Sequence, residues 1–311
     1  MAGDETQLRQ AIESSVDAVL DPAFLQRIDR LRLRARATRS LREGENPTAH
    51  AATPSGSELE AHRPYYPGDD LRRVDWNAYG RLDQLIVRLY RAEREAPHHL
   101  LIDSSASMAF PPDDRKLPFA AALVTALAYA AVRNHDPVRL LYVGSAHATG
   151  YAASPRIAHL RQMPLVRQWL VGVRPQGEAA LTTAVQRWLQ TRPTAGVAVI
   201  VSDFLMPPAE YEPALGELAA RGFETTCVRV LGPAERDPTR SFRSGTVIDA
   251  ETGERRELHL ETGNLARYQA ALNRQLTSLA ELCARRRIGY AVAETAGALQ
   301  PELLQRIGRL R

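Results

Sequence analysis

The fold is decided by a short apolar run that ends in polar residues. Residues 98–108 have the sequence HHLLIDSSASM, in which an expected strand at 98–103 leads into Asp103, Ser105 and Ser107. A strand that is apolar on both faces is typical of a parallel sheet covered by helices on both sides. Open parallel sheets bind their ligands beyond the carboxyl ends of their strands, so this loop is a candidate site.

The chain on either side of this run alternates between short apolar segments and amphipathic ones. We expect strands at 84–90, 98–103, 138–143, 197–201, 224–231 and 290–293. We expect helices at 116–134, 165–171, 181–190, 208–221, 265–287 and 301–310. Such alternation predicts an α/β fold with a mostly parallel sheet between layers of helices. Residues 241–260, with Thr252-Gly253 at the turn, predict an inserted β-hairpin.

Two regions are expected along the chain. Residues 1–95 form an N-terminal extension, with a helix over 6–42, a loop-rich segment over 43–80 and the strand at 84–90. Residues 96–311 form the α/β domain. Within the helical segment, Arg30-Leu31-Arg32-Leu33-Arg34 also alternates with a period of two, which leaves a strand as the rival interpretation there.

The composition is that of an ordinary globular protein with an unusual choice of basic residue. The 311 residues are 44% hydrophobic and carry a net charge of +4, and Lys116 is the only lysine. The arginine-rich segments contain no interleaved aromatic residues, so we expect no specific nucleic-acid binding. Two distant cysteines, a polar N-terminus and no apolar run long enough for a membrane span predict a cytoplasmic protein.

A second polar residue follows another apolar strand. Asp203 comes after the strand at 197–201, and the parallel geometry brings it to the same edge as Asp103. Two carboxylates that face one pocket repel each other unless a cation lies between them. Hard divalent cations prefer oxygen ligands, so Asp103, Ser105, Ser107 and Asp203 are the candidate metal site. The alternative is a simple Asx or serine turn without a ligand.

The spacing D-x-S-x-S, closed by Met108, resembles the metal-ion-dependent adhesion site (MIDAS) of von Willebrand factor A domains. Residues 57–93 resemble the bacterial family known as domain of unknown function 58. The resemblance implies a Rossmann-like, three-layer von Willebrand factor A domain with an N-terminal extension. It also implies that Ser105 and Ser107 bind Mg²⁺, Mn²⁺ or Ca²⁺ directly, with Asp103 and Asp203 acting directly or through water.

The same resemblance implies a non-catalytic role. The expected function is metal-dependent protein–protein interaction, with a MoxR-type AAA+ ATPase as partner, in the assembly or maturation of other proteins. A carboxylate of the partner would complete the metal shell. One position departs from the family pattern, because Ala179 stands where a threonine ligand is expected. Thr182, Thr183 or Glu178 are the candidates to replace it, and weak metal binding is expected.

The segment Gly68-Asp69-Asp70 has two interpretations. Its acids, with Asp75, form either a second metal or partner site, or pairs with arginines that pin the extension to the main domain above a packed Trp76. No phosphate-binding loop, H-E-x-x-H or G-x-S-x-G pattern is present, so we expect no enzyme. The alternatives are a metal-dependent hydrolase using Asp103 and Asp203, and a structural scaffold with a degenerate site.

Overall fold

The computed structural model describes residues 2–30, 59–90, 96–240, 242, 244–259 and 262–309. The chain divides into two compact units, of which the larger joins residues 1–37 to 96–311 and the smaller comprises residues 38–95. The expected extension of residues 1–95 is therefore not one region. Its N-terminal helices pack against the α/β domain, because their apolar faces are buried there.

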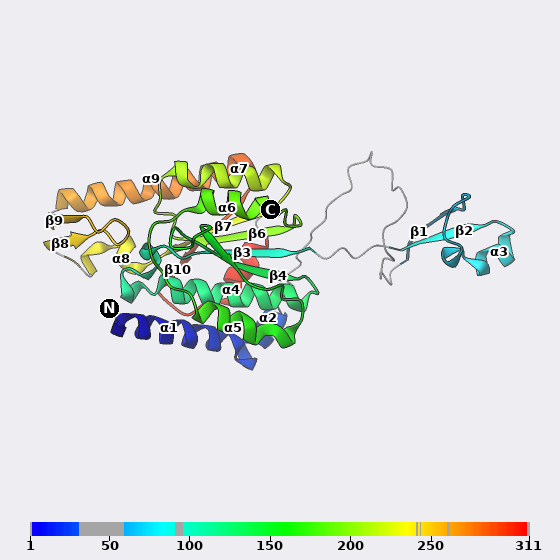
Figure 1. The fold of residues 1–311 in the computed structure, drawn as a ribbon, viewed down its shortest axis with the longest axis horizontal. Coiled ribbons are helices and arrows are strands. Elements are labelled where there is room, and N and C mark those ends of the chain that lie inside the picture. Colours follow the sequence, from blue (N-terminus) through cyan, green and yellow to red (C-terminus); the bar gives the residue numbers. More distant parts are fainter. Residues whose placement is uncertain are drawn as a thin grey trace. The chain divides into compact units, whose positions relative to one another are not determined.

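The large unit is built on a six-stranded sheet with the strand order β10-β7-β6-β3-β4-β5 (Figure 1). Its strands are β3 (His98–Asp103), β4 (Val138–Val143), β5 (Tyr151–Ala153), β6 (Val197–Ser202), β7 (Glu224–Leu231) and β10 (Gly289–Glu294). Five of them run parallel, and β5 pairs antiparallel with β4 at the edge. The predicted mostly parallel sheet is confirmed, although the short strand β5 was not expected.

Helices cover both faces of this sheet, as the apolar strands predict. One face carries α1 (Ala2–Leu20), α2 (Pro22–Arg30), α4 (Lys116–Arg133), α5 (Met163–Val171) and α10 (Pro301–Arg309). The other face carries α6 (Leu181–Gln190), α7 (Glu212–Ala220) and α9 (Thr262–Arg286). Figure 1 shows these two layers on either side of the sheet. The predicted three-layer α/β arrangement is confirmed.

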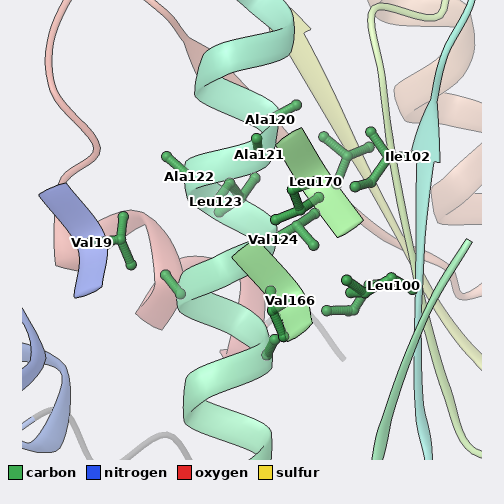
Figure 2. Close-up of a cluster of buried hydrophobic side chains, with 14 of the residues drawn as sticks. Val19, Leu100, Ile102, Ala120, Ala121, Ala122, Leu123, Val124, Val166 and Leu170 are labelled. Carbon is green, nitrogen blue, oxygen red and sulfur yellow. The ribbon is translucent and has the colours of Figure 1, made fainter. Parts of the chain in front are cut away.

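Helix α4 is the centre of the first layer. Its side chain Val124 lies on the side of the helix that faces Leu100 and Ile102 of β3 (Figure 2), and α5 and α1 pack around the helix. A helix enclosed in this way is apolar all round. Among the described residues, Pro112–Arg133 is the one helical stretch long and apolar enough to cross a membrane, and 89% of its apolar window is buried inside the protein. Its apolarity follows from this place in the core.

The N-terminal helix predicted for residues 6–42 begins at Ala2 and is divided at Asp21. The Asp21 carboxylate accepts a hydrogen bond from Ala23 N at 2.9 Å and so starts α2 as a helix of its own. The part of this prediction over residues 31–42 lies outside the described residues. The hairpin predicted for 241–260 is confirmed as β8 (Ser244–Ile248) paired with β9 (Arg255–His259).

The small unit pairs β1 (Leu59–Pro64) antiparallel with β2 (Ile86–Tyr90), and α3 (Trp76–Leu82) lies between them in the chain. The strand expected at 84–90 is confirmed, while β1 and α3 were not expected. Asp75 starts α3, because its carboxylate accepts hydrogen bonds from Asn77 N and Ala78 N. The unit therefore owes its local structure to turns and caps more than to a core.

Candidate functional site

Asp103 occupies the carboxyl edge of the sheet as the last residue of β3. Ser105 N donates to its Oδ1 at 2.8 Å, and Ser202 Oγ donates to its Oδ2 at 2.6 Å. Ser202 ends β6, the strand next to β3, so one carboxylate is fixed by two neighbouring strand ends. The side chain is buried, with 4% of the residue exposed. Asp103 is thereby held in place at the base of the loop.

The two serines of the loop lie side by side. Ser105 Oγ and Ser107 Oγ are 3.0 Å apart, and Ser105 is fully buried while Ser107 is partly exposed. Neighbouring ligands of an octahedral Mg²⁺ at about 2.1 Å are about 3.0 Å from each other. Among the described residues, no three His, Cys, Asp or Glu side chains form a metal-binding group by themselves. A cation at this edge would therefore depend on the serine hydroxyls, whose spacing suits it.

Asp203 reaches the same edge and is paired with the only lysine of the chain. Lys116 Nζ donates to Asp203 Oδ2 at 2.8 Å and also to Glu235 Oε1. The lysine side chain is fully buried at the start of α4, and Glu235 belongs to α8 (Pro233–Arg236). The cation expected between two acidic strand ends is thus partly supplied by the protein itself. The ammonium group of Lys116 donates a hydrogen bond to Asp203. The hydrogen bonds to the Asp103 carboxylate come from Ser105 N and Ser202 Oγ instead.

The carboxyl groups of Asp103 and Glu235 at this edge have raised pKa values. Burial, and then the nearby Asp203 carboxylate, raise the pKa of Asp103 to about 6. Burial also raises the pKa of Glu235. Burial alone would lower the pKa of Lys116, but Asp203 and Glu235 outweigh it and raise that pKa above its usual value. The ammonium stays charged, yet it does not balance all the carboxylates around it.

The loop before α6 closes the site from the side. Ala106 N donates to Gly177 O and Gln176 N donates to Ser104 O, both at 3.0 Å, so the two loops run beside each other. Ala179 lines a small cavity together with Asp103 and other residues of the edge. This is the position where the family pattern expects a threonine, and the methyl group offers no oxygen.

The other candidates for that missing oxygen are placed elsewhere. Thr182 Oγ1 donates to Glu210 O at 2.8 Å, and Thr183 and Glu178 are exposed. The Glu178 backbone is bound to Ser145, whose hydroxyl accepts from Glu178 N at 2.8 Å. Neither threonine therefore takes the place that Ala179 leaves without a hydroxyl.

Four residues of the site were missed in the sequence: Lys116, Ser202, Glu235 and Glu251. Glu251 lies in the turn of the β8–β9 hairpin, where burial raises its pKa and the negative charge of Asp203 adds to that shift. Lys116 carried a usable signal, because a single lysine stands among 40 basic residues that are otherwise arginine. A compact ammonium suits a narrow buried pocket better than a planar guanidinium does.

The acids of the small unit form a different kind of arrangement. Arg63 binds Asp69 through two hydrogen bonds of 2.6 and 2.7 Å, and Arg88 binds Asp75 at 2.9 Å. These pairs hold the small unit itself together, because all four residues belong to it. Trp76, which the pairing hypothesis placed in a packed position, is 58% exposed. That detail of the hypothesis is wrong, whereas its arginine–carboxylate pairs are present.

The chain has similar relatives among known proteins. The chain is 34% identical over 214 residues to uncharacterized proteins of Mycobacterium tuberculosis and Mycobacterium bovis, covering 66% of this chain and 64% of theirs. It therefore spans less than two thirds of the length of these relatives.

Similar folds include BatB from Bacteroides thetaiotaomicron, at 16% identity and a TM-score of 0.41, covering 69% of this chain and 98% of that one. A von Willebrand factor type A protein from Catenulispora acidiphila is similar at 13% identity and a TM-score of 0.37, covering 72% and 42%. Residues 61–278 match the family described as "Protein of unknown function DUF58". Because this match covers more than half of the sequence, the chain belongs to the DUF58 family.

Proposed function

We propose that this protein is a non-catalytic interaction module that binds an acidic side chain of a partner protein through a divalent cation, Mg²⁺ or Mn²⁺. The observation that carries the proposal is the pair of serine hydroxyls 3.0 Å apart, next to the buried carboxylate of Asp103. Ser105 and Ser107 would hold the cation, and Asp103 and Asp203 would supply charge beside it. A bound cation would offer an open coordination position to a carboxylate of the partner.

The charge of the edge supports a cation. Four carboxylates, those of Asp103, Asp203, Glu235 and Glu251, are arranged around the site with one ammonium group, that of Lys116. When all are ionised, the excess is three negative charges. Burial is the main cause of the raised pKa values of Asp103, Glu235 and Glu251, and the negative charge of Asp203 adds to each shift. A divalent cation would remove most of the excess negative charge.

The hydrolase alternative has less support than the binding module. Asp69 and Asp75, the further acids it would use, are engaged with Arg63 and Arg88. Asp203 and Glu235 share the Lys116 ammonium. Phosphoryl chemistry with two metals requires several carboxylates that are free to bind them. An AAA+ ATPase of the MoxR type remains the partner that we propose, on the family resemblance alone.

A metal titration tests the proposal directly. We expect Mn²⁺ and Mg²⁺ to raise the melting temperature of the wild type and to give a binding isotherm by calorimetry. Ser105→Ala/Ser107→Ala should abolish both effects. Ser104→Ala is the matched control, because the Ser104 hydroxyl donates to Val143 O and is not one of the proposed ligands. Absence of binding to the wild type at millimolar metal would refute metal dependence.

The partner is tested by capture from the native host. Wild-type protein in Mg²⁺ should retain an AAA+ ATPase, and either EDTA or the double serine variant should release it. Retention that is indifferent to both treatments would favour a scaffold whose site is degenerate. Phosphatase activity lost on Asp103→Ala would instead favour the hydrolase.

A further inference from the structure

Arg229 is a buried arginine near the carboxyl edge of the sheet. It belongs to β7, and 1% of the residue is exposed. In the register of the sheet it pairs with Ser202 of β6, the residue whose hydroxyl binds Asp103. Side chains alternate along a strand, so Arg229 lies on the same face as Cys227, which α7 and α9 cover (Figure 1). This edge is where open parallel sheets bind their ligands.

The guanidinium group of Arg229 has more donors than the protein satisfies. Its Nη2 donates to Gln275 Oε1 at 3.2 Å. Its Nε and Nη1 are buried and have no hydrogen-bond partner in the part of the chain that the structure describes, and no carboxylate there forms an ion pair with them. Arginine keeps its charge inside a protein, and a buried charge without a partner is strongly unfavourable. The free donors therefore point to an acceptor that this chain does not supply.

A second unsatisfied donor lies on the same face of the sheet. Tyr290 of β10 is two residues before Val292, the register partner of Arg229, and its buried hydroxyl also has no hydrogen-bond partner among the described residues. The two side chains are close enough for their charges to interact, since the positive charge of Arg229 opposes the rise in the pKa of Tyr290 that burial causes. A phenol hydroxyl can donate to the same oxygen ligand as a guanidinium group.

Gln275 of α9 lies between Arg229 and the protein surface. Its Oε1 accepts from Arg229 Nη2 and its Nε2 donates to Leu205 O, each at 3.2 Å. Gln275 is half-buried and Leu205 is 40% exposed, so both are reached by solvent. Both hydrogen bonds are at the long end of the normal range, and a rotation of the Gln275 side chain breaks them without a shift of the helix. Such a rotation opens a path from solvent to the guanidinium group.

We propose that Arg229 is the centre of an oxyanion site that binds a phosphate or carboxylate group through Nε and Nη1, with the Tyr290 hydroxyl as a further donor. A planar guanidinium group matches the spacing of two oxygens on such a group. The bound anion supplies the negative charge that the buried arginine lacks. No divalent cation is needed, so the site is independent of the proposed function.

Calorimetry with inorganic phosphate tests the site on the full chain, in EDTA and at constant ionic strength. We expect the wild type to bind phosphate and Arg229→Met to lose this binding. Arg229→Met should fold, because it leaves no buried charge behind. The matched control is Arg267→Met, which removes an exposed arginine of α9 and should bind as the wild type does. Gln275→Ala should bind more tightly, because the amide that occupies Nη2 is gone. Sodium acetate in the same titration distinguishes a carboxylate ligand from a phosphate ligand.

NMR of the arginine Nε–Hε groups reports the contact itself and does not depend on a variant that lacks the arginine. In the wild type and in Gln275→Ala, the Arg229 signal should move when phosphate is added, while the Arg267 signal should stay in place. If neither anion binds the wild type at millimolar concentration, or if a folded Arg229→Met binds as the wild type does, the oxyanion site is refuted. Either result leaves the proposed function standing, because EDTA removes divalent cations from these experiments.

Discussion

The two units of this protein each contain aspartates, and they use them in opposite ways. In the large unit, Asp103 and Asp203 are 4% and 1% exposed, and the pKa of Asp103 is raised to about 6 by burial and by Asp203. In the small unit, hydrogen bonds from Arg63 and from the backbone lower the pKa of Asp69 to about 2. Asp75 is lowered likewise, first by Arg88.

The opposite pKa shifts of Asp103 and Asp69 distinguish an aspartate that could bind a cation from one that has a structural role. When an arginine binds an aspartate through two hydrogen bonds, its positive charge balances the carboxylate and both carboxylate oxygens accept hydrogen bonds. Such an aspartate stabilises the local turn. A buried aspartate without a full complement of positive charge is stabilised by binding a cation. Aspartates with pKa values shifted in this way are common at binding sites. By this criterion we propose the D-x-S-x-S edge as the binding site and the Gly68-Asp69-Asp70 segment as a structural element of the small unit.

Substitution of Lys116 should cause the largest loss of stability, because its ammonium group is the buried partner of Asp203 and Glu235. Lys116→Met leaves Asp203 and Glu235 buried without their partner, so we expect the free energy of unfolding of the large unit to fall by about 3–5 kcal/mol. Urea denaturation followed by circular dichroism measures this loss.

The matched control replaces all three charges. Lys116→Met/Asp203→Asn/Glu235→Gln should recover most of the loss, because no buried charge remains without a partner. Arg63→Met, which breaks an exposed pair, should change the denaturation midpoint far less. A Lys116→Met protein as stable as the wild type would show that the ammonium group does not compensate Asp203.

The comparison also shows how far sequence reasoning reaches. The central strands are predictable because each is a continuous apolar run, and the parallel geometry then brings Asp103 and Asp203 to one edge. The arginine pairs of the small unit were one of two open interpretations, and neither β1 nor α3 carries a strong periodic signal.

Contacts that depend on packing were not predictable. Lys116 meets Asp203 from 87 positions away, and nothing local to either residue indicates it. Glu251 belongs to a hairpin whose strands are exposed. The sequence of the hairpin predicts a turn, but not where that turn lies relative to the sheet. The N-terminal helices were assigned to the extension although they pack on the large unit. The apolar face of a helix shows that it is buried, but not against which surface.

An effect of intermediate size on metal affinity is expected when a threonine hydroxyl is introduced at position 179. Ala179→Thr places a hydroxyl in the cavity that Ala179 shares with Asp103. We expect Mn²⁺ affinity to rise about tenfold, equivalent to about 1.4 kcal/mol, because one more hard ligand faces the cation. Ala180→Thr is the control, since Ala180 does not line this cavity. Equal affinities for Ala179→Thr and the wild type would mean that position 179 does not face the cation.

The smallest expected effect concerns the acids that we assign a structural role. The pKa of Asp69 is about 2 in the folded unit against an ordinary value of 3.8, so its pairing contributes stability above about pH 4, and this contribution is lost as the pH falls toward 2. A carboxyl-carbon NMR titration should show Asp69 titrating near pH 2, and closer to its ordinary value in Arg63→Met, where the hydrogen bond from Tyr66 N still lowers the pKa. Mn²⁺ binding should be the same for Asp69→Asn and the wild type. If Asp69→Asn instead weakened Mn²⁺ binding, or if Asp69 titrated near pH 4 in the wild type, the contrast between the two sets of aspartates would fail.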